Sequence, residues 1–358
     1  MKKYNIFLVI FTLILSLLGL LMIYSSSYVW AEYKFNDSYK YLKSQALFLI
    51  IGFICMYLVS KLNYKVYYKY SNKLFLICFI LLVLVLFIGT ERNGSKSWFG
   101  IGSFGIQPSE FMKLSMIIFV SKYLYNNEKE MGNIKKGVLP ILTLTLIIFG
   151  LIMLEPDFGT GVILVMGVIG LLFVGGVDIK FFLKISIFGI AFIAILILIA
   201  PYRLKRILSF LNPWSDPLGS GFQIIQSLYA IGPGGLFGMG LGKSIQKHFY
   251  LPEPQTDFIF AIISEEFGFL GVFLVSTLFI LVIITGINIA LKCQNLFGKY
   301  LAFGIIFELS FQTLLNLMVV VGLIPVTGVT LPFLSYGGSS LVITLISMGI
   351  ILNIGNRQ

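Results

Sequence analysis

Runs of about 17 to 23 predominantly apolar residues recur along almost the whole chain. An α-helix of about 20 such residues crosses the ~30 Å hydrocarbon core of a bilayer, because each residue adds about 1.5 Å. The 358 residues are 58% hydrophobic and 11% charged, whereas soluble domains carry about 25% charged residues. The alternation of apolar and polar residues that a membrane β-barrel requires is missing. The sequence therefore predicts an all-α polytopic membrane protein.

Ten transmembrane helices fit this pattern, and we expect them to form a single transmembrane domain over residues 1–358. The predicted spans cover residues 6–28, 45–62, 73–90, 108–125, 137–154, 158–176, 181–201, 257–290, 299–322 and 336–354. The longest loop, at about residues 202–256, separates the seventh span from the eighth.

Lysine and arginine residues favour the set of loops that includes both chain termini, although these loops are the shorter ones. The positive-inside rule therefore places the N and C termini in the cytoplasm and the 202–256 loop outside. This topology and the anionic lipid headgroups account for the net charge of +11, so no nucleic acid partner is indicated. The three cysteines have neither metal-site spacing nor a disulfide framework.

The segment YLPEPQTDFIFAIISEE, which begins at Tyr250, carries the carboxylate of Asp257 directly into an apolar run. A charge at the edge of a membrane costs several kcal/mol unless something compensates it, so such a residue is a functional candidate by default. The alternative is a residue that only marks the helix boundary.

Two further groups of acids lie in or beside predicted spans. Glu110 and Lys113 are three residues apart, so they share a helix face and can form an ion pair. Such a pair either stabilises the bundle or lines a cavity. Glu155 and Asp157 flank Pro156 at the outer end of the fifth span, where a simple turn is the alternative interpretation.

The long outer loop combines glycines, an amphipathic stretch and basic residues. Its IGPGGLFGMGLG segment looks like a nucleotide-binding fingerprint but lacks the strand–turn–helix context, so close backbone packing is the better explanation. FQIIQSLYAI predicts a short helix at the interface. Arg203, Arg206, Lys243 and Lys247 are candidates for holding an anionic ligand, with headgroup anchoring as the alternative.

The chain has one histidine, His248, and no P-loop motif, so a Ser/His/Asp triad and nucleotide-driven chemistry are not indicated. An enzyme built from this sequence would depend on carboxylates.

The segment NLMVVVGLIPVTGVTLPFLSYGGSS, residues 316–340, resembles the signature of the SEDS family (shape, elongation, division and sporulation), which includes FtsW, RodA and SpoVE. IQPSEFMKL, EPDFGTG and LPEPQTDFIFAIISEE resemble other blocks of this family, in the expected order. The amino-acid sequence of the outer loop resembles the FtsW and SpoVE branch more than the RodA branch. One departure is Ser97 before Trp98, where many members have arginine.

The resemblance implies a peptidoglycan glycosyltransferase with ten spans in the bacterial cytoplasmic membrane. Its substrate would be the undecaprenyl-linked lipid II, polymerised at the outer face for cell division or sporulation. The implied catalytic aspartate is Asp257, and the implied substrate-binding residues include Glu110, Lys113 and Asp157. The implied partners are a class B penicillin-binding protein acting as transpeptidase and other division or sporulation membrane proteins.

A glycosyl donor on a lipid pyrophosphate needs a base for the acceptor hydroxyl and cations for the leaving group. We therefore expect inverting transfer with Asp257 as base and Arg203, Arg206, Lys243 and Lys247 near the pyrophosphate. A Mg²⁺ or Mn²⁺ ion could share that role, with Asp257 as its possible ligand, and no organic cofactor is expected. A lipid II flippase and a non-catalytic scaffold of the division or sporulation complex are the alternatives.

Overall fold

The computed structural model describes residues 2–357 apart from 93–94, 102–103, 200–203 and 205–207. Each of the ten predicted spans overlaps one helix of the described residues, although several helices extend beyond the predicted bounds. These helices are α1 (Lys2–Phe35), α2 (Lys40–Lys61), α3 (Lys65–Ile88), α4 (Pro108–Asn126), α5 (Leu139–Leu154), α6 (Phe158–Val174), α7 (Ile179–Ile199), α10 (Ile259–Lys292), α11 (Leu296–Val320) and α12 (Gly338–Asn356). Within the described residues, seven helices are long and apolar enough to cross a membrane, so the chain is a multi-pass membrane protein.

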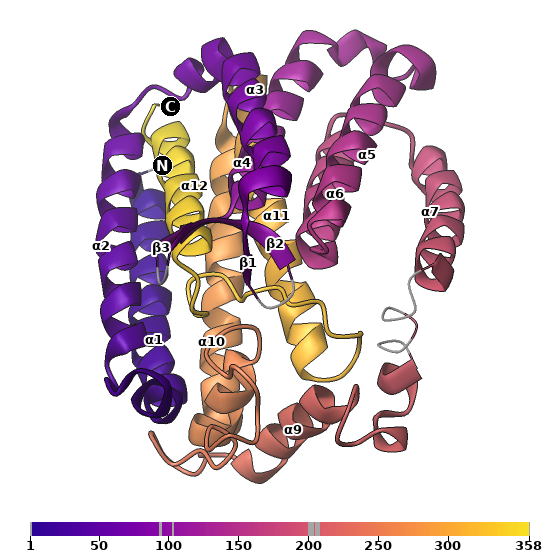
Figure 1. Ribbon diagram of the computed structural model, residues 1–358. Coiled ribbons are helices and arrows are strands. Elements are labelled where there is room, and N and C mark those ends of the chain that lie inside the picture. The colour runs from indigo at the N-terminus through magenta and orange to yellow at the C-terminus, as the bar shows by residue number, and fades with distance from the viewer. Residues whose placement is uncertain (1, 93–94, 102–103, 200–203, 205–207, 358) are drawn as a thin grey trace.

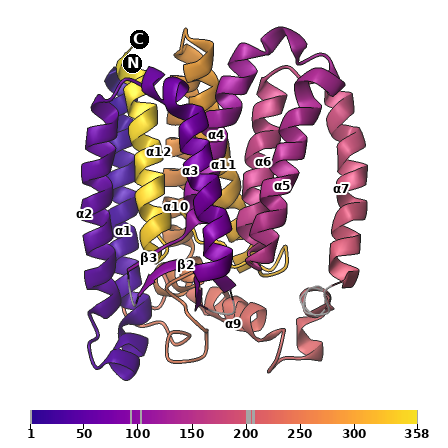
Figure 2. The same ribbon diagram turned by 45° about the horizontal axis from the view of Figure 1, so that its top comes forward.

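The helices run side by side, and both termini lie at the same end of the bundle (Figures 1 and 2). The helices α1, α2 and α12 pack together on one side, α10 and α11 lie in the middle, and α5, α6 and α7 lie on the other side. Lys292 at the end of α10 donates to the hydroxyl of Tyr4 (3.3 Å), so α10 ends beside the N-terminus and begins at the opposite end. We call these the terminal end and the loop end of the bundle.

A small antiparallel sheet, which was not predicted from the sequence, precedes α4. Its strands are β1 (Thr90–Arg92), β2 (Ser95–Ile101) and β3 (Phe104–Ile106), in the order β1–β2–β3. The hydroxyl of Ser339 donates to the Gly105 carbonyl (2.7 Å), which ties β3 to the first turn of α12.

The amphipathic segment of the outer loop forms α9 (Phe222–Ile231), as predicted. The glycine-rich segment after it packs against a break in α10 at Gly268, whose φ is 61°. A Cβ at Gly268 would lie 2.4 Å from the amide nitrogen of Gly238, so only glycine fits there. The amide of Phe269 donates to the Gly235 carbonyl (2.8 Å), and the amide of Met239 donates to the Glu265 carbonyl (2.9 Å). The loop thus supplies the backbone partners that the broken helix loses.

Candidate functional site

Asp257 lies two residues before α10, at the loop end of the bundle. The N-terminus of a helix carries a partial positive charge, which favours a carboxylate at this position. The hydroxyl of Thr256 donates to Asp257 Oδ1 (2.9 Å), and the Asp257 side chain is partly exposed. An acid held at the mouth of a long apolar helix is therefore accessible from the side on which the 202–256 loop lies.

The backbone around Asp257 is fixed by the segment between α11 and α12. Three successive carbonyl oxygens, those of residues 255–257, each accept a hydrogen bond from it. The donors are the Tyr336 amide (2.8 Å), the Ser335 hydroxyl (2.5 Å) and the Asn316 side-chain amide (2.7 Å), in that order. The family signature included Asn316 and Ser335, and the structure supplies a physical reason for both: they hold the aspartate-bearing segment in place.

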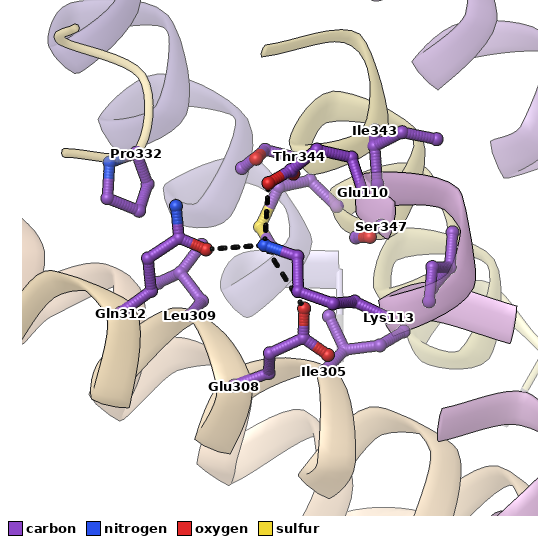
Figure 3. Close-up of a pocket in the computed structure, with 12 residues that line it drawn as sticks. Glu110, Lys113, Ile305, Glu308, Leu309, Gln312, Pro332, Ile343, Thr344 and Ser347 are labelled. Carbon is purple, nitrogen blue, oxygen red and sulfur yellow. Dashed lines mark hydrogen bonds and ion pairs between the residues drawn. The ribbon is translucent and has the colours of Figure 1, made fainter. Parts of the chain in front are cut away.

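A second charged cluster lies inside the bundle, where α4 faces α11 (Figure 3). The ammonium of Lys113 is 3.0 Å from Glu110 Oε1, as the three-residue spacing predicted, and 4.0 Å from Glu308 Oε1. It also donates to Gln312 Oε1 (3.0 Å). The Lys113 side chain is only 2% exposed. We call these four residues the Lys113 cluster.

The Lys113 cluster borders a cavity of about 30 Å³, which Thr344 and Ser347 of α12 also line (Figure 3). A water molecule needs about 10–15 Å³ of such space, so the cavity has room for one or two. The cluster contains two carboxyl groups and one ammonium, and polar partners from α12 line the remaining space. The cluster therefore has more carboxyl groups than ammonium groups, and it borders space that water can enter.

One face of α11 connects the Lys113 cluster to the Asp257 segment. Gln312, which contacts the Lys113 ammonium, donates to the Thr330 carbonyl (3.0 Å). Asn316, one turn later on the same face, donates to the Val329 carbonyl (2.7 Å) as well as to that of Asp257. The buried charges and the partly exposed aspartate thus share one rigid support.

Asp157 caps the start of α6, and its side chain joins two helices. Its Oδ1 accepts from the Thr160 amide (3.1 Å), and its Oδ2 accepts from Nε2 of Gln107, the residue before α4 (2.9 Å). N-cap bonds of this kind typically stabilise by about 1 kcal/mol. Both carboxylate oxygens of Asp157 thus have partners, while its side chain stays partly exposed.

Glu155 is fully buried between α5 and α6, and among the described residues neither of its carboxylate oxygens has a hydrogen-bond partner. Burial, reinforced by the nearby charge of Asp157, raises the pKa of the Glu155 carboxyl to about 9. The hydroxyl of Ser95 donates to its backbone carbonyl instead. Glu155 is therefore protonated, and so uncharged, at neutral pH.

The structure corrects the expectation that Lys247 contacts an anionic ligand. The Lys247 side chain is 0% exposed, its ammonium is 2.9 Å from Glu266 Oε1, and it lies 5.0 Å from the centroid of the Tyr28 ring. The hydroxyl of Ser25 also donates to Glu266 (2.6 Å). Lys243 is exposed on the same loop, as a ligand contact would require. Arg203 and Arg206 lie outside the described residues.

Glu265 and Glu266 bind the outer loop to α10 and do not face a ligand site. This structural role was not predicted from the sequence. Glu265 accepts hydrogen bonds from the Ser244 hydroxyl (2.5 Å) and the Ile245 amide (2.7 Å). We call Lys247, Glu266 and Glu265 the loop latch, because they fasten residues 244–247 to α10. The sequence feature that could have indicated this role is the pair of adjacent acids inside an apolar run, with no cation near them in sequence.

Comparison with known proteins identifies the family of this chain. The family model FTSW_RODA_SPOVE, described as "Cell cycle protein", matches residues 5–358. "Stage V sporulation protein E" of Bacillus subtilis (strain 168) is 53% identical over 352 residues, which cover 98% of this chain and 96% of that relative. "Probable peptidoglycan glycosyltransferase FtsW" of Geobacter sp. (strain M18) is 38% identical over 359 residues, with 100% and 98% covered.

A solved structure described as "Structural coordination of polymerization and crosslinking by a peptidoglycan synthase complex" contains a chain of the same fold. The TM-score is 0.80 at 32% sequence identity, and the match covers 98% of this chain and 96% of that chain.

Proposed function

The chain belongs to the FtsW/RodA/SpoVE family, and from this membership we propose that it is a peptidoglycan glycosyltransferase that polymerises lipid II. The observation that carries the proposal is the position of Asp257, a partly exposed acid whose backbone is held at three successive carbonyls. Catalysis by proton transfer depends on such preorganisation, because a base must lie within hydrogen-bond reach of the hydroxyl that it activates.

In the proposed reaction the Asp257 carboxylate accepts the proton of the acceptor sugar hydroxyl. The hydroxyl oxygen forms a bond to the anomeric carbon of the donor, and the bond from that carbon to the lipid pyrophosphate breaks. The pyrophosphate leaves with the electron pair, and the configuration at the anomeric carbon inverts. One carboxylate is sufficient for this step, since the acceptor itself supplies the nucleophile.

The leaving pyrophosphate needs positive charge, and Lys243 is the exposed described candidate among the basic residues predicted for this role. Within the described residues there is no group of three or more His, Cys, Asp or Glu side chains that would hold a metal alone. A Mg²⁺ or Mn²⁺ ion would therefore be held by Asp257 together with substrate phosphate oxygens, which is a donor set that Mg²⁺ commonly takes. When bound, such an ion would neutralise charge on the leaving group.

The other predicted site residues support this aspartate in the proposal. Glu110 and Lys113 position Gln312 of α11, which in turn holds the outer loop at Thr330. Asp157 fixes the start of α6 against the segment before α4. In this proposal the ten helices that match the predicted spans cross the bacterial cytoplasmic membrane, with both termini inside and the loop end outside. A class B penicillin-binding protein is the proposed transpeptidase partner, in division or sporulation.

The test is polymerisation of lipid II by the purified full-length protein, with and without the transpeptidase partner. Asp257→Asn should abolish long glycan strands while the denaturation midpoint in detergent changes little. Glu253→Gln is the matched control, because it removes an exposed carboxylate four residues earlier, and it should retain activity. Strand synthesis by the Asp257→Asn protein would exclude the aspartate as base.

The same assay separates the alternatives. A flippase would move a fluorescent lipid II across vesicles without extending glycan chains, and a scaffold would do neither. The cavity at the Lys113 cluster, about 30 Å³, holds one or two waters but not a sugar, which argues against a saccharide path through the bundle in this conformation.

A further inference from the structure

A groove at the terminal end of the bundle lies far from the Asp257 site. Its volume is about 460 Å³, and α1, α2 and α12 line it. The lining is mainly apolar and includes Val9, Ile10, Phe53 and Tyr57. Tyr57 is 63% exposed and Val9 38%, so the groove opens toward the surroundings of the bundle.

The rim of this groove is basic. The Lys61 ammonium lies 5.2 Å from the centroid of the Tyr57 ring, which itself lines the groove. The Arg357 guanidinium donates to the Lys61 carbonyl (3.3 Å), so both cations lie at the same edge. Lys2 and Lys3 begin the helix that forms the opposite wall.

No acid balances these charges within the elements that form the groove. Residues 1–31, all of α2 and all of α12 contain no Asp or Glu. Among the described residues, none of Lys2, Lys3, Lys61 and Arg357 is within salt-bridge distance of a carboxylate. Within the described part of the chain, the rim therefore presents positive charge without a paired carboxylate, beside apolar surface.

We propose that this groove binds an anionic phospholipid, with one acyl chain along Val9, Ile10 and Phe53 and the phosphate at Lys61 and Arg357. Basic pockets between membrane helices on the cytoplasmic side attract anionic headgroups in this manner. The bound lipid would join the ends of α1, α2 and α12.

Native mass spectrometry of the full-length protein in detergent tests the proposal. Phosphatidylglycerol and phosphatidylcholine with identical acyl chains are the probes, and phosphatidylglycerol should bind at least about tenfold more tightly. Each basic residue near a headgroup contributes about a fivefold factor. Lys61→Gln with Arg357→Gln should therefore remove most of the preference.

The matched control is Lys34→Gln with Lys40→Gln, which removes two cations from the opposite ends of α1 and α2 and should leave the preference intact. Val9→Phe fills the groove without changing charge, and it should weaken binding while the denaturation midpoint in lipid-free detergent stays unchanged. If the double variant fails to fold, Val9→Phe and Arg357→Gln alone test the same contacts.

A phosphatidylglycerol with a diazirine in its acyl chain should label peptides containing residues 5–10 and 53–60. Equal binding of the two phospholipids would overturn the proposal, as would labelling confined to other helices. Preferential retention of a polyprenyl phosphate at this groove would also overturn it, because the occupant would then be the carrier lipid.

Discussion

Two lysine side chains among the described residues are almost completely buried, and their surroundings differ. Lys247 is 0% exposed and pairs with Glu266 at 2.9 Å in the loop latch. Lys113 is 2% exposed and faces two carboxyl groups, an amide and a small polar cavity. The first arrangement fastens a loop to a broken helix. The second connects the interior to the loop that holds Asp257.

The difference lies in how each cluster is balanced. The ammonium of Lys247 pairs with one carboxylate, that of Glu266, which also accepts a hydrogen bond from the Ser25 hydroxyl. The Lys113 cluster has two carboxyl groups for one ammonium, and its cavity has room for water. A buried pair is costly to break when it is dry, because the remaining charge loses all compensation. Water beside a charge reduces that cost.

The largest effect is expected for Lys247→Met. Glu266 would be left as a buried charge without a cation, which costs about 3–5 kcal/mol of unfolding free energy. The measurement is the denaturation midpoint in detergent. Lys243→Met is the control, because it removes an exposed lysine from the same loop and should change stability by about 0.5 kcal/mol or less. Equal midpoints for the two variants would show that the loop latch does not stabilise the folded protein.

A smaller loss is expected for Lys113→Met, about 1–3 kcal/mol, since cavity water can solvate Glu110 and Glu308. Polymerisation should fall further than stability does, because Gln312 loses the contact that orients it toward Thr330. Adding Glu110→Gln to this variant should recover part of the stability. If Lys113→Met destabilises as much as Lys247→Met, the cavity does not solvate the cluster and the contrast between the two lysines fails.

Asn316→Ala tests the link between the clusters. It removes the donors to the Asp257 and Val329 carbonyls, at about 1 kcal/mol each. We expect kcat for lipid II polymerisation to fall about tenfold or more with KM nearly unchanged, because the aspartate is displaced while substrate contacts remain. Asn288→Ala, on the exposed face of α10, should alter neither constant. A change in KM alone would assign Asn316 to substrate binding instead.

The helices were predictable from the sequence because the bilayer imposes their length. The predicted span 108–125 became α4 (Pro108–Asn126), and the predicted ion pair of Glu110 and Lys113 formed because helix geometry fixes neighbours three residues apart. Asp257 was also predictable as an acid at the start of an apolar run, which few membrane proteins tolerate without a purpose.

What the sequence could not supply was contact between distant segments. The partner of Glu266 comes from a loop 19 residues earlier, and Ser25 comes from another helix altogether. The break at Gly268 was hidden, because a glycine within an apolar run is equally compatible with an unbroken helix. The misassignment of Lys247 followed from this, since its burial depends on the loop packing onto that break.

Glu155 provides a third case, a buried acid with no cation, and the smallest expected effect at pH 7. Its pKa is raised to about 9 from an ordinary value of 4.5. The native state therefore holds a proton that the unfolded state releases above pH ~4.5. The associated stability is present below pH ~4.5 and is lost as the pH rises through about 9. Wild-type protein should thus become less stable between pH 5 and 9.

Glu155→Gln should remove this slope, because an amide does not titrate in that range. At pH 7 the variant should be more stable by only about 1 kcal/mol, since the buried amide also lacks partners. The denaturation midpoints of both proteins, measured at half-unit steps from pH 5 to 9, should cross: the wild type is the more stable protein near pH 5, because the buried amide of the variant lacks partners, and the variant is the more stable one near pH 9. Parallel curves would mean that Glu155 is paired or hydrated. Glu155 would then not be a buried acid without compensation, and it could no longer be contrasted with Glu266, which is paired with Lys247.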